Sequence, residues 1–362
     1  MEKYILPLAL ALVLGFLVTP RVRALAVKCG ALDYPEPRKI HNGPMPRLGG
    51  LAVYLAFVPA VLLFRELALQ VWGLLAGATL VLLLGIVDDI RGLSPRVKLA
   101  GQVAASLAVI PFGVQVHFIT NPLNGDMIML GAFSIPLTVL WIVAVTNAVN
   151  LIDGLDGLAG GVSSIAALTM AAVAWTQWIM FGIDGLPEMI MLALTLVAAV
   201  TGFLRHNFYP AKIFLGDSGS MFLGFTLAVM AILSLTKSAT AISVFIPLVI
   251  LGVPLLDTFF AVIRRYHLHR PIFQPDREHL HHQLMAMGLN HRQTVLAIYG
   301  LSAFLGLSAV VLNLVSNHQA LFMLVIIAVA VFYLADRVGV MGDARRAGYE
   351  LSDKYRQRSS KM

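Results

Sequence analysis

The chain has few cysteines and few charged residues, and both observations limit the classes of protein to which it can belong. It has one cysteine, Cys29, among 362 residues, which excludes an internal disulfide and a cysteine-based metal site. Charged residues make up only 12% of the chain, about half of the share in a typical soluble domain. Since 59% of the residues are hydrophobic and the mean hydropathy is +0.83, the composition indicates an integral membrane protein.

The apolar runs predict an all-α, polytopic fold. Each run is roughly 16 to 22 residues long, the length at which a helix crosses a hydrocarbon core of about 30 Å, whereas the strands of a membrane barrel are about half as long. No repeat, low-complexity block or linker rich in proline, glycine or serine divides the chain, so residues 1–335 are expected to form one transmembrane domain and residues 336–362 a basic tail. The expected spans, eleven in all, are 4–20, 48–64, 67–87, 99–117, 131–148, 159–181, 188–204, 220–236, 241–263, 294–314 and 320–335.

Basic residues set the predicted orientation. Of the 26 lysines and arginines, only Lys3, Arg65 and Lys237 fall on the outer side of this topology. Because lysine and arginine mark the cytoplasmic side, we expect the N-terminus outside and the C-terminus in the cytoplasm. Basic residues follow the first apolar run rather than precede it, which favours a permanent span over a cleaved signal. The net charge of +7 is spread over the inner loops, which favours membrane lipids over nucleic acid as its partner.

The first acidic motif ends the third expected span. Asp88 and Asp89 are adjacent in the run 85–92, and neighbouring residues of a helix point about 100° apart, so one is expected to face inward while the other caps the next segment. Two carboxylates this close raise one pKa or attract a cation. A solvated acidic pair at the membrane surface is the structural alternative, and the motif alone leaves both interpretations open.

A second motif, N-A-V-N-L-I-D-G-L-D-G-L at 147–158, places four polar groups at three-residue spacing: Asn147, Asn150, Asp153 and Asp156. They are expected to follow one helical face or to line one unwound turn, with glycines between them that allow close approach of backbone or ligand. The spacing does not fit a calcium-binding EF-hand loop, and no terminal glutamate is present. A purely structural turn is the alternative.

The third motif, F-L-G-D-S-G-S at 214–220, brings Asp217 to the start of the eighth expected span. Oxygen donors without thiols favour Mg²⁺ or Mn²⁺ as the bound ion. Asp217 or Ser218 would also serve as a helix N-cap, a role that is compatible with metal binding.

A histidine segment lies between the ninth and tenth expected spans. The run 277–284 reads R-E-H-L-H-H-Q-L and contains Arg277, His279, His281 and His282. Three histidines within four residues, without a glutamate or cysteine at zinc-site spacing, favour recognition of a diphosphate over zinc.

The segment at 37–50, P-R-K-I-H-N-G-P-M-P-R-L-G-G, leads into the second expected span and offers Lys39, His41 and Arg47 to a phosphate. Ordinary positive-inside charge accounts for Arg38 and Lys39 almost as well. On the predicted topology, this segment, the acidic motifs and the histidines all fall at one membrane face. A transporter is expected to place such groups near the bilayer midplane, and a non-enzymatic scaffold gives no reason for the convergence, so an enzyme is favoured.

These motifs, in this order, resemble the polyprenyl-phosphate N-acetylhexosamine-1-phosphate transferases of glycosyltransferase family 4, over nearly the whole chain. The histidine segment is similar to the D-R-x-H-x-H-H form of the UDP-GlcNAc transferases. The branch that transfers phospho-MurNAc-pentapeptide reads P-x-H-H-H there and T-P-T-M-G-G at the entry, where this chain has M-P-R-L-G-G at 45–50. That branch also has ten spans rather than eleven.

The resemblance implies a multi-pass enzyme of the bacterial cytoplasmic membrane with its active site on the cytoplasmic face. It would transfer GlcNAc-1-phosphate from UDP-GlcNAc to undecaprenyl phosphate and release UMP, the first membrane step of a surface glycan such as teichoic acid or O-antigen. Mg²⁺, or alternatively Mn²⁺, would be the cofactor, and a homodimer is expected. The alternatives are phospho-MurNAc-pentapeptide transfer and, from another class, membrane transport.

The resemblance also assigns roles to the candidate residues. Asp217 would be the first Mg²⁺ ligand and Asn150 the second. Asp88 and Asp89 would position the lipid phosphate, while Asp153 and Asp156 would hold the nucleotide or support the residues that contact it. The remaining candidates would contact the substrates: Lys39, His41, Arg47, Asn147, Arg277, His279, His281 and His282.

Overall fold

The structure is a computed structural model that describes residues 2–34, 43–64, 66–121, 126–235, 244–267 and 279–339. Within these ranges the protein is helical apart from two pairs of very short strands. Three candidate residues, Lys39, His41 and Arg277, lie outside the described residues, as does most of the expected tail at 336–362.

Long apolar stretches of sequence form long helices. Capping boxes start the last two of them, through Asn290 with Gln293 and through Ser316 with Gln319. The helices are α1 (Glu2–Cys29), α2 (Gly49–Val61), α3 (Leu69–Arg91), α4 (Pro95–Ala108), α5 (Ser134–Leu151), α6 (Leu158–Phe181), α7 (Leu186–Asn207), α8 (Gly216–Leu235), α9 (Phe245–Ile250), α10 (Gly252–His267), α11 (Leu280–Ala286), α12 (His291–Leu314) and α13 (Asn317–Val338).

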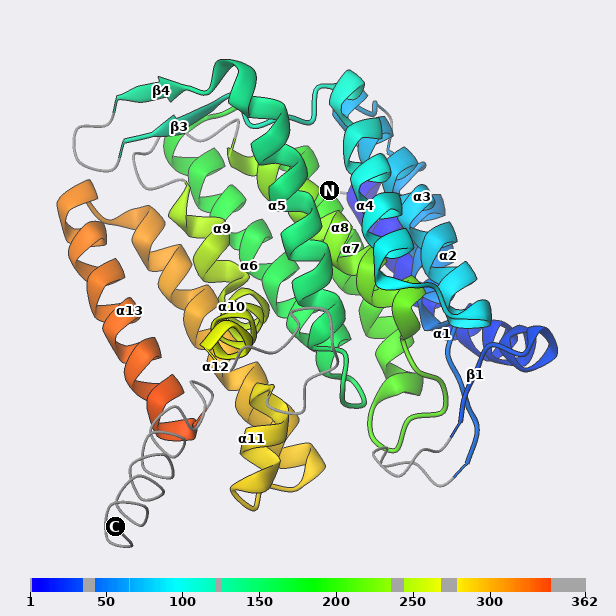
Figure 1. Ribbon diagram of the computed structural model, residues 1–362. Coiled ribbons are helices and arrows are strands. Elements are labelled where there is room, and N and C mark those ends of the chain that lie inside the picture. Colours follow the sequence, from blue (N-terminus) through cyan, green and yellow to red (C-terminus); the bar gives the residue numbers. More distant parts are fainter. Residues whose placement is uncertain are drawn as a thin grey trace, which may run out of the picture.

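The strands form two antiparallel pairs. The pair of β1 (Leu32–Asp33) with β2 (Met45–Pro46) follows α1, and the pair of β3 (Phe118–Thr120) with β4 (Met127–Met129) connects α4 to α5 through two short 3₁₀ turns. Figure 1 shows these pairs at opposite ends of the helical bundle. The β3–β4 pair therefore marks the upper end of the bundle in the figure, and the β1–β2 pair the lower end.

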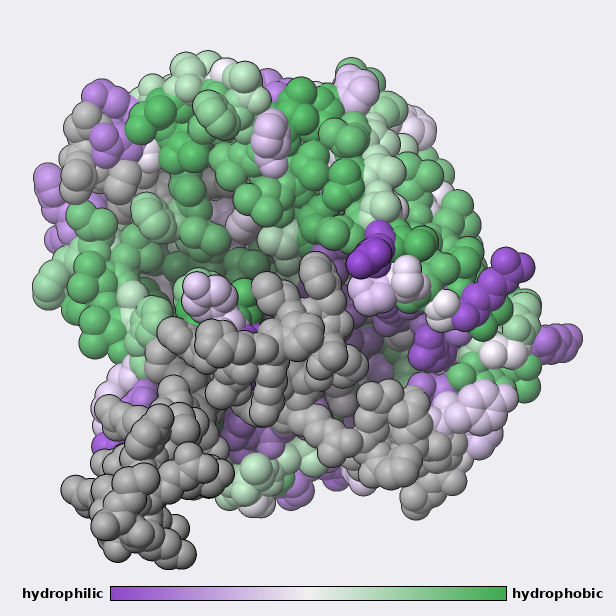
Figure 2. All heavy atoms as spheres, viewed as in Figure 1, coloured by the Kyte–Doolittle hydropathy of each residue, from purple (hydrophilic) through white to green (hydrophobic). Residues whose placement is uncertain are grey.

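Helix α8 is the centre of the bundle. It packs against α2, α3, α5 and α6, and aromatic side chains such as Phe222 and Phe225 are fully buried along it. At the periphery, α13 buries only Ala320 and Ala335. Figure 2 shows a broad apolar surface over the helices, with hydrophilic residues gathered towards the lower end. A bundle whose outside is as apolar as its core is the pattern of a protein in lipid.

Eight of the described helices are long and apolar enough to cross a membrane: α1, α3, α5, α6, α7, α8, α12 and α13. The protein is therefore a polytopic, all-α membrane protein, as expected. At the expected spans 48–64 and 99–117, the structure has the shorter helices α2 (13 residues) and α4 (14 residues). The described part of the span expected at 241–263 is divided at Leu251, between α9 and α10. The count of eleven spans and the orientation stay predictions.

Three glycines bring α2, α3 and α8 into backbone contact. A Cβ atom on Gly50 would lie 2.1 Å from the backbone nitrogen of Gly219, and one on Gly85 would lie 2.4 Å from the Cα of Ser218. Neither distance is sterically tolerable, so only glycine permits this approach. The glycines of the entry, V-D-D and G-D-S-G motifs thus set the distance between the helices that carry Asp88, Asp89 and Asp217.

We expect Gly85→Ala to destabilise the protein, because the added methyl group meets backbone rather than a flexible side chain. The cost of such overpacking is about 1–3 kcal/mol, measurable as a lower melting temperature in detergent. Gly300→Ala is the matched control: Gly300 lies in α12 with open space around its Cα, so alanine is expected to be neutral or stabilising. Equal melting temperatures for the two variants would contradict the close approach.

Candidate active site

Asp89 ties the end of α3 to the start of α8. Its carboxylate is fully buried, and its two oxygens accept the backbone N–H groups of Asp217 (2.9 Å) and Ser218 (3.0 Å). The first amides of a helix have no partner inside the helix, and a negative charge there is also favoured by the helix dipole. Asp89 therefore caps α8 from a distant part of the chain, while Asp88 serves the next segment by accepting the N–H of Leu93 at 2.6 Å.

Arg47 completes this arrangement from the side of α2. Its Nε lies 3.3 Å from Asp89 Oδ1 and its Nη1 3.5 Å from Asp33 Oδ1, and its Nη2 donates to the Asp88 carbonyl at 3.3 Å. The neighbouring backbone pairs directly with the third motif, because Phe214 donates to the Pro46 carbonyl and Gly49 to the Phe214 carbonyl. Arg47, expected to contact a phosphate, is thus engaged with carboxylates of the protein itself.

Lys98 lies between the two acidic motifs. Its ammonium group is 3.0 Å from Asp88 Oδ2 and also donates to Asp217 Oδ2. The Lys98 and Asp217 side chains are about one-quarter exposed, at 26% and 27%, whereas Asp88 is 5% exposed. Lys98, Asp88 and Asp217, which we call the acid–lysine cluster, therefore form a charged site with one open side.

The second motif forms the turn from α5 to α6. Asn147 and Asn150 belong to the end of α5, and Asp153 and Asp156 to the turn that follows. Asp156 accepts the N–H of Ala211 at 2.9 Å, which holds the α7–α8 loop against this turn. Burial, reinforced by the charges of Asp217, Asp89 and Asp156, raises the pKa of Asp153 well above its ordinary value. Asp153 thus shares the electrostatic environment of the acid–lysine cluster.

Asn147 has a different neighbour from the other polar groups of the motif. Its amide exchanges hydrogen bonds with the buried Gln102 of α4, at 2.6 Å and 3.3 Å. Its described contacts are thus those of a helix-to-helix link, and its expected contact with substrate stays a prediction.

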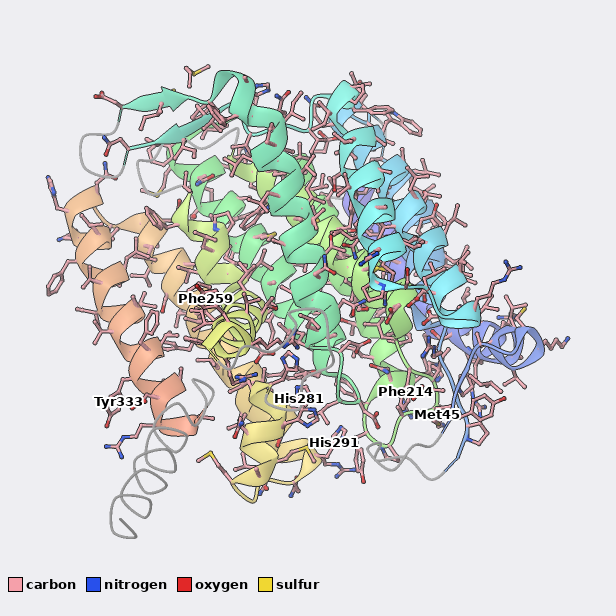
Figure 3. All side chains as sticks on the ribbon, in the orientation of Figure 1. Met45, Phe214, Phe259, His281, His291 and Tyr333 are labelled. Carbon is pink, nitrogen blue, oxygen red and sulfur yellow. The ribbon has the colours of Figure 1, made fainter. Side chains whose placement is uncertain are left out.

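The histidines gather beside the α5–α6 turn. The His279 and His281 rings are parallel with centroids 6.1 Å apart, and those of His281 and His282 are 4.2 Å apart. A Cβ atom on Gly154 would lie 2.4 Å from His281 Nε2, so the ring rests on that glycine. Burial, reinforced by His282, lowers the pKa of His281 to about 3, so this ring is a neutral hydrogen-bonding group at physiological pH. Figure 3 shows His281 and His291 at the same end of the bundle as Met45 and Phe214.

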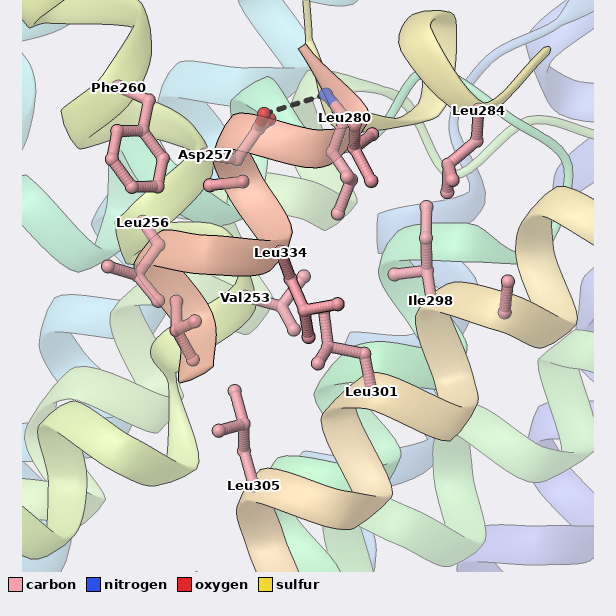
Figure 4. A pocket seen from close by; sticks show the side chains of 14 residues that line it. Val253, Leu256, Asp257, Phe260, Leu280, Leu284, Ile298, Leu301, Leu305 and Leu334 are labelled. Carbon is pink, nitrogen blue, oxygen red and sulfur yellow. Dashed lines mark hydrogen bonds between the residues drawn. The ribbon is translucent and has the colours of Figure 1, made fainter. Parts of the chain in front are cut away.

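Asp257 of α10 holds the histidines in place. Its Oδ2 lies 2.9 Å from His279 Nδ1, and its Oδ1 accepts the N–H of Leu280 at 2.8 Å (Figure 4). Both side chains of the pair are buried. On its other side, Asp257 borders an apolar cavity of about 230 Å³ between α10, α11, α12 and α13. The cavity lies beside the histidines rather than at the acid–lysine cluster.

The chain is similar to a family model and to several named proteins. The model of "Glycosyl transferase family 4" matches residues 71–235. A Bacillus subtilis protein described as a probable undecaprenyl-phosphate N-acetylglucosaminyl 1-phosphate transferase is 40% identical over 95% of this chain and 94% of its own. A decaprenyl-phosphate N-acetylglucosaminephosphotransferase of Mycobacterium tuberculosis is 36% identical over 84% and 81%. The chain belongs to glycosyl transferase family 4.

The family implies a metal, and the residues of this transferase fit Mg²⁺ or Mn²⁺. Asp217 offers a partly exposed carboxylate and Asn150 an amide oxygen, the hard donors that these ions prefer. The Lys98 ammonium group pairs with the carboxylates of Asp88 and Asp217 and offsets part of their negative charge. Among the described residues no group of three His, Cys, Asp or Glu side chains is placed to hold a metal. This donor set suits an ion that completes its shell with water and substrate phosphates.

Two residues of the site, Lys98 and Asp257, do not belong to the sequence motifs from which the site was predicted. Lys98 looks in the sequence like any lysine of an inner loop, so nothing there indicated its role. Asp257 did carry a signal, because a carboxylate in the apolar run 241–263 is costly in a membrane and usually functional.

We expect Asp153→Asn to stabilise the transferase at neutral and higher pH while lowering its activity. A carboxyl whose pKa is raised by folding contributes stability below its ordinary value of 3.8, and that stability is lost as pH rises through the folded value. The amide has no proton to lose, so the variant's melting temperature is expected to exceed that of the wild type at pH 8 and to approach it towards pH 5. Asp184→Asn, at an exposed position, is the control. Identical melting temperatures for Asp153→Asn and the wild type at pH 8 would contradict a raised pKa of Asp153 in the folded protein.

Asp257→Asn is expected to lower turnover while the protein stays folded. The amide no longer accepts from both His279 Nδ1 and Leu280 N, so the imidazole loses its fixed orientation, and a small misplacement of a substrate-contacting group costs roughly 100-fold. Turnover by purified variants, with Asp184→Asn as the control, checks this. Wild-type turnover would mean that the pair has no part in activity.

Proposed function

We propose that the protein transfers GlcNAc-1-phosphate from UDP-GlcNAc to undecaprenyl phosphate, giving undecaprenyl-diphosphate-GlcNAc and UMP. The observation that carries the proposal is the acid–lysine cluster, in which Asp88, Asp217 and Lys98 meet at the open side of a buried acidic site. A reaction between two phosphate anions needs cations that offset their repulsion and stabilise the charge of the leaving group. The Bacillus subtilis relative is named for N-acetylglucosaminyl 1-phosphate transfer to undecaprenyl phosphate, and the Mycobacterium tuberculosis relative for phosphotransfer of N-acetylglucosamine to decaprenyl phosphate.

In this proposal, an oxygen of the lipid phosphate attacks the sugar-proximal phosphorus directly, and UMP leaves. Asp217 and Asn150 would hold Mg²⁺, which supplies Lewis-acid stabilisation of the transferring phosphoryl group. Lys98 would contact the diphosphate, since it is the charged donor on the open side of the cluster. Asp88 would position the lipid phosphate, a group that is largely ionised at neutral pH and needs little help from a base.

The other candidates have supporting roles. Asp89 and Arg47 act through the start of α8, because their charges are turned to its backbone and to each other. Asp153 and Asp156 would hold the nucleotide, with Asp156 also fixing the α7–α8 loop. His279, His281 and His282, together with Arg277 from outside the described residues, would bind the diphosphate or the sugar.

The proposed setting is a bacterial cytoplasmic membrane crossed eleven times, with the N-terminus outside and the active site facing the cytoplasm. Two observations support it: the excess of basic residues in the loops at the site end, and the position of Met45, Phe214 and His281, from three of the motifs, at one end of the bundle (Figure 3). A homodimer is part of the same proposal, from family resemblance alone. We favour GlcNAc-1-phosphate transfer over phospho-MurNAc-pentapeptide transfer because of the M-P-R-L-G-G sequence at 45–50 and the histidine segment.

The test is a transfer assay with purified protein in detergent, undecaprenyl phosphate and labelled UDP-GlcNAc, with and without Mg²⁺, beside UDP-MurNAc-pentapeptide. Metal-dependent lipid product and UMP are expected from UDP-GlcNAc alone. Product from the MurNAc nucleotide alone would move the protein to the other branch, and no product from either would return attention to transport.

In the same assay, Asp217→Asn is expected to reduce turnover at least about 100-fold, since it removes the charged metal ligand and one partner of Lys98. The Asp89 cap binds the backbone N–H of residue 217, which is kept, so the variant should fold. Near-wild-type turnover with Asp217→Asn would contradict the metal role.

A further inference from the structure

In the acid–lysine cluster, the ammonium group of Lys98 lies beside Asp217, the residue at which a metal ion would bind. Lys98 Nζ donates to Asp217 Oδ2 and lies 3.0 Å from Asp88 Oδ2. Asp217 is also the carboxylate assigned to Mg²⁺ in the proposed function, on which this inference rests. The ammonium group of Lys98 thus contacts the same carboxylate that would bind the divalent ion.

An ammonium group and a divalent ion cannot share this carboxylate at low cost. Their charges repel, and the surroundings weaken that repulsion less than bulk water does, because Asp88 is 5% exposed and Asp217 only 27%. A metal that binds Asp217 must therefore displace Lys98 from that carboxylate, and the ammonium loses one of its two carboxylate partners. Free metal ion is thus expected to bind weakly.

The substrate diphosphate removes this conflict. Lysine has a long, flexible stem, and Lys98 is partly exposed, so its ammonium can move from Asp217 to an anion on the open side. The guanidinium of Arg47 also reaches the cluster, where it donates to the Asp88 carbonyl, but it is held by Asp33 and Asp89. Since the described residues offer the metal no complete ligand group, phosphate oxygens would supply both the missing metal ligands and the new partner of Lys98.

We infer that Lys98 weakens the binding of free divalent cations to Asp217, and that these cations bind more tightly together with a nucleotide diphosphate. Metal and nucleotide then bind with positive coupling, and by thermodynamic linkage each raises the affinity of the other by the same factor.

The experiment measures Mn²⁺ binding to full-length protein in detergent by electron paramagnetic resonance, with and without UDP-GlcNAc and in the absence of lipid substrate. In wild-type protein, nucleotide is expected to tighten Mn²⁺ binding at least tenfold. Lys98→Gln is expected to bind Mn²⁺ at least tenfold more tightly than wild type when no nucleotide is present, and to lose most of the coupling. Adding Asp217→Asn to Lys98→Gln should abolish the gain.

Arg96→Gln is the matched control, because it removes one positive charge from an exposed position in the same first turn of α4. Equal Mn²⁺ affinities for Lys98→Gln and Arg96→Gln would overturn the inference by showing only a general charge effect. Mn²⁺ binding to wild type that is equally tight with and without nucleotide would overturn it without any variant. The proposed function fails on a separate result, the absence of lipid product from wild-type enzyme, so the two failures are distinguishable.

Discussion

The site depends on one interaction, the buried carboxylate of Asp89 against the first amides of α8. A buried carboxylate is costly unless it is fully hydrogen-bonded and paired, and Asp89 obtains both from the α8 backbone and from Arg47. The same bonds fix where α8 begins, so they also fix the position of Asp217. Helix α8 lies far along the chain from α2 and α3, and it is joined to them by this contact and by the glycines that let their backbones meet.

This arrangement divides the labour between two adjacent aspartates. Asp89 is turned to the protein and has no exposed oxygen, whereas Asp88 belongs to the cluster with Lys98 and Asp217. Neighbouring positions on a helix face different directions, so the pair serves structure and chemistry at once. A similar division holds for the second motif, where Asp156 binds a backbone amide of the α7–α8 loop, while burial and the nearby carboxylates raise the pKa of Asp153.

In the histidine segment too, buried partners hold the side chains that would meet the substrate. His281 rests on Gly154 and is kept neutral by burial, while His279 is oriented by Asp257. The group that would meet the substrate is therefore connected through a buried carboxylate to α10, beside the apolar cavity. Polar residues inside a membrane protein are retained where they are fully partnered, and these partners all lie at one end of the bundle.

Composition and apolar runs were enough to predict an all-α, polytopic membrane protein, because hydrocarbon accepts only backbones that satisfy their own hydrogen bonds. The order and spacing of the motifs were enough to predict the family, and the predicted topology already brought Asp88, Asp153, Asp217 and the histidines to one end. Packing alone decided which of the paired aspartates would cap α8 and which would pair with Lys98, and that Arg47 would be held by carboxylates of the protein. Lys98 and Asp257 acquire their roles through partners 119 and 22 residues away in the chain, and a side chain's partner across such a distance is decided by how the helices pack and not by its local sequence.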